Sequence, residues 1–416
     1  MAGRPIAWVG VADLRRRPTA SPAHRIEGLG ETIFAEMSAL AVATGSLNLG
    51  QGFPDSDGPP ALLDAARRAI ASGHNQYPPG LGVPELRAAV AEHQRRHYGM
   101  EWDLDREVLI TTGATEALAA AILAFVEPGD EVIALEPFFD SYPAAVQLAG
   151  GRLRGVLLNP PDFGLRAEAL EAAVTPRTRV LLLNTPHNPT GAVLDADAMR
   201  AVADVAARHD LLVISDEVYE HLTFDGRAHI PIATLPGMAD RTLTAGSAGK
   251  TFSVTGWKVG WLTGPAPLVS AARAVKQYLT YVSGAPLQPA VAEVLGTHDD
   301  WVAGLRDSLQ GRRDLLVDGL RHLGMETYTP AGTYFTVSDV RSWGYEDGAQ
   351  FARDLPGRAG VVTIPCSAFY DRHREPSDET GRSLVRWTFS KAEQTLAQAL
   401  ERLRAARPMM VGDASP

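Results

Sequence analysis

Short apolar segments alternate with longer, helix-like segments through the middle of this 416-residue chain. The apolar runs cover residues 108–110, 132–135, 153–158, 180–183, 211–214, 242–244 and 259–263, and helical stretches such as 115–125, 140–148 and 195–209 separate most of them. Strands that are apolar throughout are typical of a parallel sheet with both faces covered. The pattern therefore predicts an α/β domain with roughly seven, mostly parallel strands flanked by helices.

The pattern changes on both sides of this region. Residues 1 to about 30 are rich in Pro, Arg and Ala without periodicity, so we predict an arm that is ordered only where something packs on it. Further segments are predicted as helices at 31–44, 59–72, 84–97, 300–323 and 394–406, and as strands at 47–55, 333–337, 361–364 and 384–389. The segments of this set that follow residue 300 indicate a smaller α+β domain at the C-terminal end.

The length of the chain also favours two domains, because 416 residues exceed what one hydrophobic core usually holds. We assign residues 1–57 to the N-terminal arm and part of the small domain. Residues 58–299 form the predicted large domain, and residues 300–416 form the predicted C-terminal small domain.

Composition narrows the classes of function. The net charge of −10 argues against a nucleic acid or an acidic membrane as a general partner. Cys366 is the single cysteine, so an internal disulfide is excluded, and we expect a reducing, cytoplasmic location. No run is long and apolar enough to span a membrane, no secretion signal is evident, and we identify no set of metal ligands.

Polar and aromatic residues follow several of the predicted strands. In a parallel sheet, ligands bind at the carboxyl ends of the strands, so these residues are expected to meet at one edge. The segments are 111–116, 137–142, 184–191, Asp216 with Tyr219, and Ser247 with Lys250. Residues 111–116 open a helix with small side chains and a Thr hydroxyl, which predicts a seat for an anion.

Lysine is rare in this chain and clusters in one place. Of the 39 Lys and Arg residues only four are Lys, and two of these, Lys250 and Lys258, lie in the Gly- and Ser-rich segment 245–258. A lysine amine, unlike a guanidinium, can lose its proton when it is desolvated and can then form an imine. This segment is therefore a candidate for covalent chemistry.

Each candidate has a structural alternative. Asp216 could cap a following helix, and Arg386, which interrupts an apolar strand, could face water instead of binding a carboxylate. Residues 249–251 also resemble the end of a phosphate-binding P-loop, but Thr244 stands where that pattern needs glycine. Nucleotide hydrolysis is kept as an alternative.

An anion seat, an aromatic ring, a carboxylate, a lysine and an arginine together suit pyridoxal phosphate, whose aldehyde, phosphate and ring nitrogen need such partners. The motifs at 184–191, 215–219, 247–252 and 255–258 also resemble those of the class I/II aminotransferases of pyridoxal phosphate fold type I. The resemblance covers residues from about 30 to 405.

The resemblance implies roles for individual residues. Lys250 would hold the cofactor covalently and then move a proton, and Asp216 would pair with the ring nitrogen. Tyr219 and Asn188 would hydrogen-bond the ring hydroxyl, and Phe139 would stack on the ring. Four further residues would hold the phosphate: Ala114, Thr115, Ser247 and Lys258.

The remaining implied roles concern the substrate and a second subunit. Arg386 would bind the substrate α-carboxylate, helped by Asn188 and the backbone of Gly52. Tyr77 would reach the phosphate of a neighbouring subunit, which implies a homodimer with shared active sites.

Two branches of the family are most similar. Segment 50–55 and the Lys250 segment resemble kynurenine/glutamine aminotransferases, whereas segments 34–40 and 277–281 resemble bacterial N-succinyldiaminopimelate aminotransferase. Thr115 and Gly249 depart from these two patterns respectively. We predict transfer of an amino group from an L-amino acid to a 2-oxo acid, with glutamate and 2-oxoglutarate as the common pair and N-succinyldiaminopimelate, kynurenine, glutamine or methionine as candidate specific substrates. The alternatives are β-elimination from cysteine conjugates and a pyridoxal-binding regulator.

Overall fold

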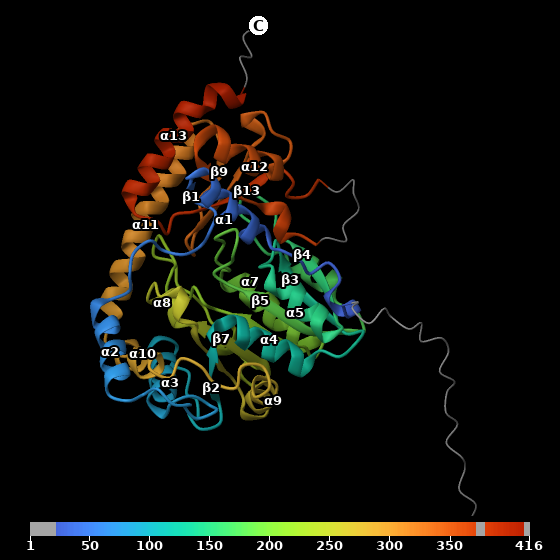
Figure 1. Cartoon of the computed structure of the whole chain (residues 1–416). Coiled ribbons are helices and arrows are strands. Elements are labelled where there is room, and N and C mark those ends of the chain that lie inside the picture. Colours follow the sequence, from blue (N-terminus) through green and yellow to red (C-terminus); the bar gives the residue numbers. More distant parts are fainter. Residues whose placement is uncertain (1–21, 372–378, 412–416) are drawn as a thin grey trace, which may run out of the picture.

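A computed structural model describes residues 22–371 and 379–411 of the chain (Figure 1). Its α-helices are α1 Ile33–Thr44, α2 Pro60–Ala71, α3 Pro84–Tyr98, α4 Gly113–Phe125, α5 Ser141–Ala149, α6 Ala167–Ala173, α7 Ala196–Arg208, α8 Ala248–Thr251, α9 Ala266–Lys276, α10 Leu287–Leu295, α11 Asp299–His322, α12 Gly348–Ala359 and α13 Glu393–Val411. Short 3₁₀ turns are η1 His24–Ile26, η2 Ile232–Thr234, η3 Ala239–Arg241, η4 Thr255–Trp257, η5 Arg341–Trp343 and η6 Cys366–Phe369.

The strands form three sheets. They are β1 Leu47–Asn48, β2 Val108–Thr112, β3 Glu131–Glu136, β4 Arg152–Leu157, β5 Thr178–Asn184, β6 Leu212–Asp216, β7 Thr242–Ser247, β8 Val259–Thr263, β9 Glu326–Tyr328, β10 Phe335–Asp339, β11 Val361–Val362, β12 Ile364–Pro365 and β13 Leu384–Thr388. The largest sheet has seven strands in the order β2-β8-β7-β6-β5-β3-β4. Only β8 runs antiparallel to its neighbours within it. The predicted α/β class and the seven mostly parallel strands are thus confirmed.

Both faces of the large sheet are covered, which explains why its strands are apolar throughout. Along β5, Val180 and Leu182 pack with α4, α5 and α9 on one face, whereas Leu181 and Leu183 pack with α6 and α7 on the other. Successive side chains of a strand point to opposite faces, so each face needs its own apolar set. The alternating helices seen beside the sheet in Figure 1 supply both sets.

The C-terminal part carries a four-stranded antiparallel sheet in the order β12-β13-β10-β9. The strands expected at 333–337, 361–364 and 384–389 correspond to β10, to β11 with β12, and to β13, whereas β9 was not predicted. A separate two-stranded sheet joins β1 to β11 in parallel, with Leu47 opposite Val361. The N-terminal segment therefore packs with the C-terminal part of the chain.

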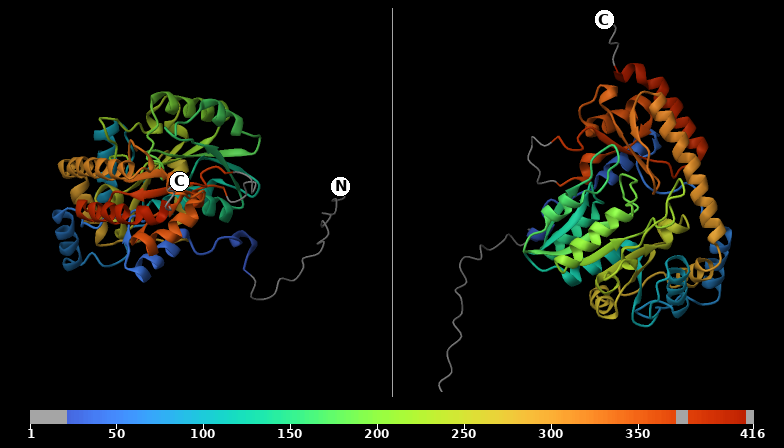
Figure 2. Two further views of the ribbon diagram at one scale, coloured as in Figure 1. Left: turned by 90° about the horizontal axis from the view of Figure 1, so that it is seen from above. Right: turned by 180° about the vertical axis from the view of Figure 1, so that it is seen from behind.

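Helix α11 connects the two regions of the molecule. It lies beside α13 at one end and extends toward α2 and α10 at the other, as Figure 1 and the reverse view in Figure 2 both show. The predicted boundary at residue 300 falls at its first turn and remains a prediction.

Most of the predicted arm lies outside the described residues. Its last part forms η1, where Gln147 of α5 donates hydrogen bonds to the carbonyls of Arg25 and Glu27 at 3.2 and 2.8 Å. No helix in the described part of the chain is both long and apolar enough to cross a lipid bilayer.

Candidate active site

The predicted site residues lie at the carboxyl edge of the large sheet. Asp216 ends β6, and Ser247 ends β7 next to it. Strand β8 runs in the opposite direction, so the residue that precedes it, Lys258, lies at this same edge. The antiparallel strand thus brings a second lysine to the place where its parallel neighbours end.

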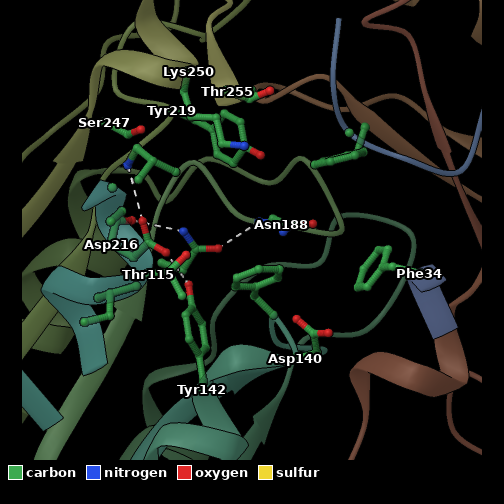
Figure 3. A pocket seen from close by; sticks show the side chains of 18 of the residues that line it. Phe34, Thr115, Asp140, Tyr142, Asn188, Asp216, Tyr219, Ser247, Lys250 and Thr255 are labelled. Atoms are coloured by element: carbon green, nitrogen blue, oxygen red, sulfur yellow. Dashed lines mark hydrogen bonds between the residues drawn. The ribbon is translucent and has the colours of Figure 1, made fainter. Parts of the chain in front are cut away.

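A cavity of about 380 Å³ opens at this edge (Figure 3). Eleven of the twelve predicted site residues line it, and Tyr77 is the exception. The eleven are Gly52, Ala114, Thr115, Phe139, Asn188, Asp216, Tyr219, Ser247, Lys250, Lys258 and Arg386. They come from both the large sheet and the C-terminal sheet, so the cavity lies between the two.

Lys250 reaches the cavity from α8, the short helix that follows β7. Its Nζ atom is 5.8 Å from the ring centroids of both Tyr219 and Tyr334, whose two rings meet edge to face at 5.1 Å. Figure 3 shows Lys250 and Tyr219 side by side at the same end of the cavity. The amine of Lys250 thus lies near two phenol rings at one end of the cavity.

Asp216 is a buried acid with a defined partner. Its Oδ2 accepts a hydrogen bond of 2.6 Å from the Tyr142 hydroxyl, and its Oδ1 accepts one of 3.4 Å from the Val218 backbone. Burial raises the pKa of Asp216 to about 6, and the hydrogen bond from Tyr142 opposes that rise. Turns rather than a helix follow β6, so the interpretation of Asp216 as a helix cap is wrong.

An anion seat lies at the first turn of α4. Gly113 begins this helix with φ of +68°, and a Cβ there would stand 3.3 Å from Cε of Lys258. Nζ of Lys258 donates to the Thr115 hydroxyl at 3.3 Å, and Ala114 and Ser247 line the same part of the cavity. Burial, followed by the charge of Lys250, lowers the pKa of Lys258. Backbone N–H groups at a helix start, a hydroxyl and an ammonium group are donors that suit an anion.

Arg386 lies on the opposite wall, in the middle of β13. Its side chain is 1% exposed, so the interpretation that it faces water is wrong. It donates from Nη1 to Oδ1 of Asn188 at 3.0 Å and from Nη2 to the Gly50 carbonyl at 2.7 Å, and its guanidinium carbon is 3.9 Å from the Phe335 ring centroid. Burial lowers the pKa of Arg386 to about 10, and its Nε has no partner. A buried guanidinium that still has a donor to offer suits a carboxylate ligand.

Two aromatic residues follow β3, and only one of them lines the cavity. Phe138 is 2% exposed and belongs to the core, whereas Phe139 lines the cavity and meets Tyr142 edge to face at 5.8 Å. Gly52 lies near the Tyr334 hydroxyl, which donates to its carbonyl at 2.7 Å. A Cβ on Gly52 would lie 2.3 Å from the Phe335 ring, so only glycine fits without movement.

The cavity also contains residues to which we assigned no role, although Tyr142 and Asn184 lie in the segments 137–142 and 184–191 that we expected at this edge. Tyr142 holds Asp216, and Asn184 orients the loop by accepting from the Asn188 backbone at 2.8 Å and donating to the Asp216 carbonyl at 3.0 Å. Tyr142 follows Phe139 by three residues at the start of a helix, and this spacing was a usable signal for the contribution of Tyr142. Phe34 and Phe335, which enter from α1 and β10, have no signal in the local sequence.

Tyr77 lies away from the cavity. Its side chain is 82% exposed and meets Tyr281 at 5.6 Å, and Tyr278 beside them is 89% exposed. A role for Tyr77 in the site of the same chain is therefore ruled out by its position, and its predicted role toward a second subunit is not tested by a single chain.

Residues 44–403 match the family model described as aminotransferase class I and II. The chain belongs to this family. Among solved structures it is similar to N-succinyldiaminopimelate aminotransferase from Mycobacterium tuberculosis, with a TM-score of 0.90 and 52% identity over 93% of this chain and 100% of that one. The predicted resemblance and the fold type I architecture are confirmed.

Two further relatives are less similar, and one of them represents the predicted kynurenine branch. The methionine aminotransferase of Escherichia coli is 40% identical over 92% of this chain and 98% of its own length. The kynurenine–oxoglutarate transaminase of Dictyostelium discoideum is 38% identical over 92% of this chain and 96% of its own length. All of these relatives are aminotransferases, so the aminotransferase class is confirmed, and they lend no support to β-elimination, nucleotide hydrolysis or a regulatory role.

Proposed function

We propose that this aminotransferase uses pyridoxal phosphate held covalently by Lys250. The observation that carries the proposal is that Lys250 and Asp216 line one cavity together with an anion seat at the start of α4. The residues fit the cofactor: Gly113 leaves room beside Lys258, and the buried carboxyl of Asp216 is available to a cationic ring nitrogen.

The cofactor supplies an electron sink that stabilises negative charge at the substrate Cα. The residues of this chain bind the cofactor and orient it. Ala114, Thr115, Ser247 and Lys258 hold the phosphate, and Phe139 stacks on the ring. Asp216 keeps the ring nitrogen protonated, since a carboxylate beside a cation favours the charged form of both groups.

Other residues of the cavity transfer the proton and bind the substrate. The Lys250 amine, once free, moves the proton at the substrate Cα, and Tyr219 and Asn188 hydrogen-bond the ring hydroxyl. Arg386 binds the α-carboxylate with the help of Asn188 and the Gly52 backbone. In this position the guanidinium makes the same contacts with every amino acid, so it orients Cα without selecting the side chain.

The walls of the cavity support a class of substrate. Besides the three cations Lys250, Lys258 and Arg386, the described lining is mainly aromatic or apolar, with Phe34, Phe335, Tyr142, Val218 and Leu118. Such walls suit the apolar part of a long side chain. N-succinyldiaminopimelate, methionine and kynurenine, which the relatives' names specify, are the amino donors to test first, with 2-oxoglutarate as the common acceptor.

We further propose a homodimer in the cytoplasm. Tyr77, Tyr278, Leu279 and Tyr281 are large, exposed and apolar, and they support an interface on this side of the molecule. In the dimer, Tyr77 reaches the phosphate of the other subunit.

Spectroscopic titration tests the proposal. Purified protein reconstituted with pyridoxal phosphate should absorb visible light, and an amino donor should convert that band to the near-ultraviolet band of the aminated cofactor. Addition of 2-oxoglutarate should restore the visible band. Absence of any conversion over a panel of donors would refute transamination by this site, whereas pyruvate release without an acceptor would indicate β-elimination.

A further inference from the structure

A cluster of three histidines lies away from the cofactor cavity. His93 and His97 are four residues apart on α3, and His221 comes from the turn that follows β6. One nitrogen from each ring lies within 4.8 Å of the other two, and no other such group of His, Cys, Asp or Glu occurs in the described ranges. The cluster forms no part of the site described above.

The geometry of the cluster suits a transition-metal ion. The ring centroids of His93, His97 and His221 form a triangle with sides of 4.6, 4.9 and 5.0 Å. Residues four apart on a helix point in the same direction, which is the spacing by which paired helical histidines bind zinc. The Nε2 atoms of His93 and His221 are 2.7 Å apart. Zinc–nitrogen bonds of about 2.0–2.1 Å in a tetrahedron require a separation of about 3.3 Å, so a small opening would admit the ion.

A carboxylate lies beside His97, the most exposed member of the cluster. Oδ1 of Asp299, in the first turn of α11, is 3.6 Å from Nε2 of His97. Asp299 also pairs with Arg96, whose positive charge the carboxylate offsets. His97 is 29% exposed and Asp299 is 48% exposed, so an ion can enter from solvent, whereas His93 is 2% exposed.

An outer partner is also in place. The Gln94 amide nitrogen is 3.3 Å from Nδ1 of His93, and its Oε1 is buried with no partner. The same amide donates to the carboxyl of Glu220, so Gln94 links His93 on α3 to the turn after β6.

We propose that His93, His97 and His221 bind a zinc(II) ion or a similar borderline divalent metal. The ion ties α3 to the turn after β6. That turn also contains Tyr219, two residues before His221, so the metal steadies a residue of the cofactor cavity from behind. We assign it a structural role, because its ligands lie outside the cofactor cavity.

Metal analysis of the tag-free, cofactor-loaded enzyme tests the proposal. After removal of metals with a chelating resin, the protein is given zinc chloride, passed through a desalting column and analysed by mass spectrometry for zinc. The wild-type enzyme should retain about one zinc per chain, and zinc should raise its melting temperature. Loss of a residue that hydrogen-bonds a metal ligand already lowers metal affinity about 10- to 100-fold. His97→Gln removes a ligand itself, so it should lower the affinity for zinc at least as much.

His322→Gln is the matched control, because this exposed histidine lies on α11 outside the cluster. It should retain the zinc and the shift in melting temperature. Because His97 is partly exposed, its replacement should leave the fold intact, and His221→Gln provides a second test. The proposal is overturned if the wild-type enzyme retains no zinc, if His97→Gln retains as much as the wild type, or if His322→Gln loses it equally. None of these outcomes depends on transaminase activity, so they are separate from the outcome for the proposed function.

Discussion

Replacement of Tyr142 by Phe is the sharpest test of the electrostatics of the cavity. The Tyr142 hydroxyl donates a 2.6 Å hydrogen bond to Asp216, and burial already raises the pKa of that carboxyl to about 6. The change deletes one oxygen atom and one donor while it keeps the ring that packs against Phe139. We expect the protonated form of Asp216 to become more populated at neutral pH.

The size of the effect follows from the type of bond. A hydrogen bond to a charged group contributes about 1.5–3 kcal/mol. Since one pKa unit corresponds to about 1.36 kcal/mol, the pKa of Asp216 should rise by about 1 to 2 in the cofactor-free protein. A carboxyl group is ionised above its pKa, so the wild type is mostly ionised at pH 7, whereas the Tyr142→Phe variant should be half protonated or more.

Cofactor affinity measures this change. Binding of pyridoxal phosphate to the cofactor-free protein should weaken in the wild type as the pH falls through about 6. In Tyr142→Phe the same fall should begin about 1 to 2 pH units higher, and affinity at pH 7 should drop about 2- to 10-fold. The assay is a dissociation constant from absorbance or fluorescence titration at each pH, and the difference between the two curves removes effects common to both proteins.

A matched control exists in the same chain. Tyr345 donates a hydrogen bond of 3.0 Å to Asp354, far from the cavity lining, so Tyr345→Phe removes a similar bond without touching Asp216. Its binding curve should coincide with that of the wild type. If the Tyr142→Phe curve also coincides with the wild-type curve, then Asp216 does not control cofactor binding and the assignment of its role fails.

Four further substitutions test other parts of the site. Lys250→Ala should fold but show no cofactor trapped by borohydride and no turnover, and wild-type activity in this variant would refute the role of Lys250. Arg386→Lys should lower kcat/KM about 100-fold for every amino donor because an ammonium group cannot reproduce the planar array of guanidinium donors, whereas a loss confined to acidic donors would place Arg386 at a distal carboxylate. Gly113→Ala should weaken cofactor binding at least several-fold, since its φ of +68° and the contact with Lys258 both disfavour a side chain, and an unchanged affinity would contradict the anion seat. Tyr77→Phe should weaken cofactor binding in the dimer, and mixing it with Lys250→Ala should give hybrid dimers that show whether Tyr77 acts across subunits.

Much of the secondary structure was predictable because its causes are local. The period of apolar positions and the capping residues predicted the seven strands and helices such as α3 and α11 to within a few residues. The composition after each strand predicted which residues would meet at one edge, because parallel strands place their carboxyl ends together. The scarcity of lysine and its clustering likewise made Lys250 a candidate for covalent chemistry, and that role stays a prediction.

Other features depend on parts of the chain that are distant in sequence. The order of the strands and the antiparallel direction of β8, which brings Lys258 to the site, follow from long-range pairing. The strand β9 and the pairing of β1 with β11 were not predictable from short segments, since such short strands carry little local signal. The histidine cluster joins His93 and His97 to a residue more than a hundred positions away, so a spacing of four alone could not reveal it.

The sequence by itself therefore determined the elements, their apolar faces and the types of side chain available for chemistry, since these depend on neighbours along the chain. Only the tertiary structure decided which of those side chains are buried together. Burial of Arg386 between two sheets and the hydrogen bond from Tyr142 to Asp216 are contacts across the fold. Such contacts set pKa and ligand geometry, because both depend on exclusion of water and on partners that only folding brings near.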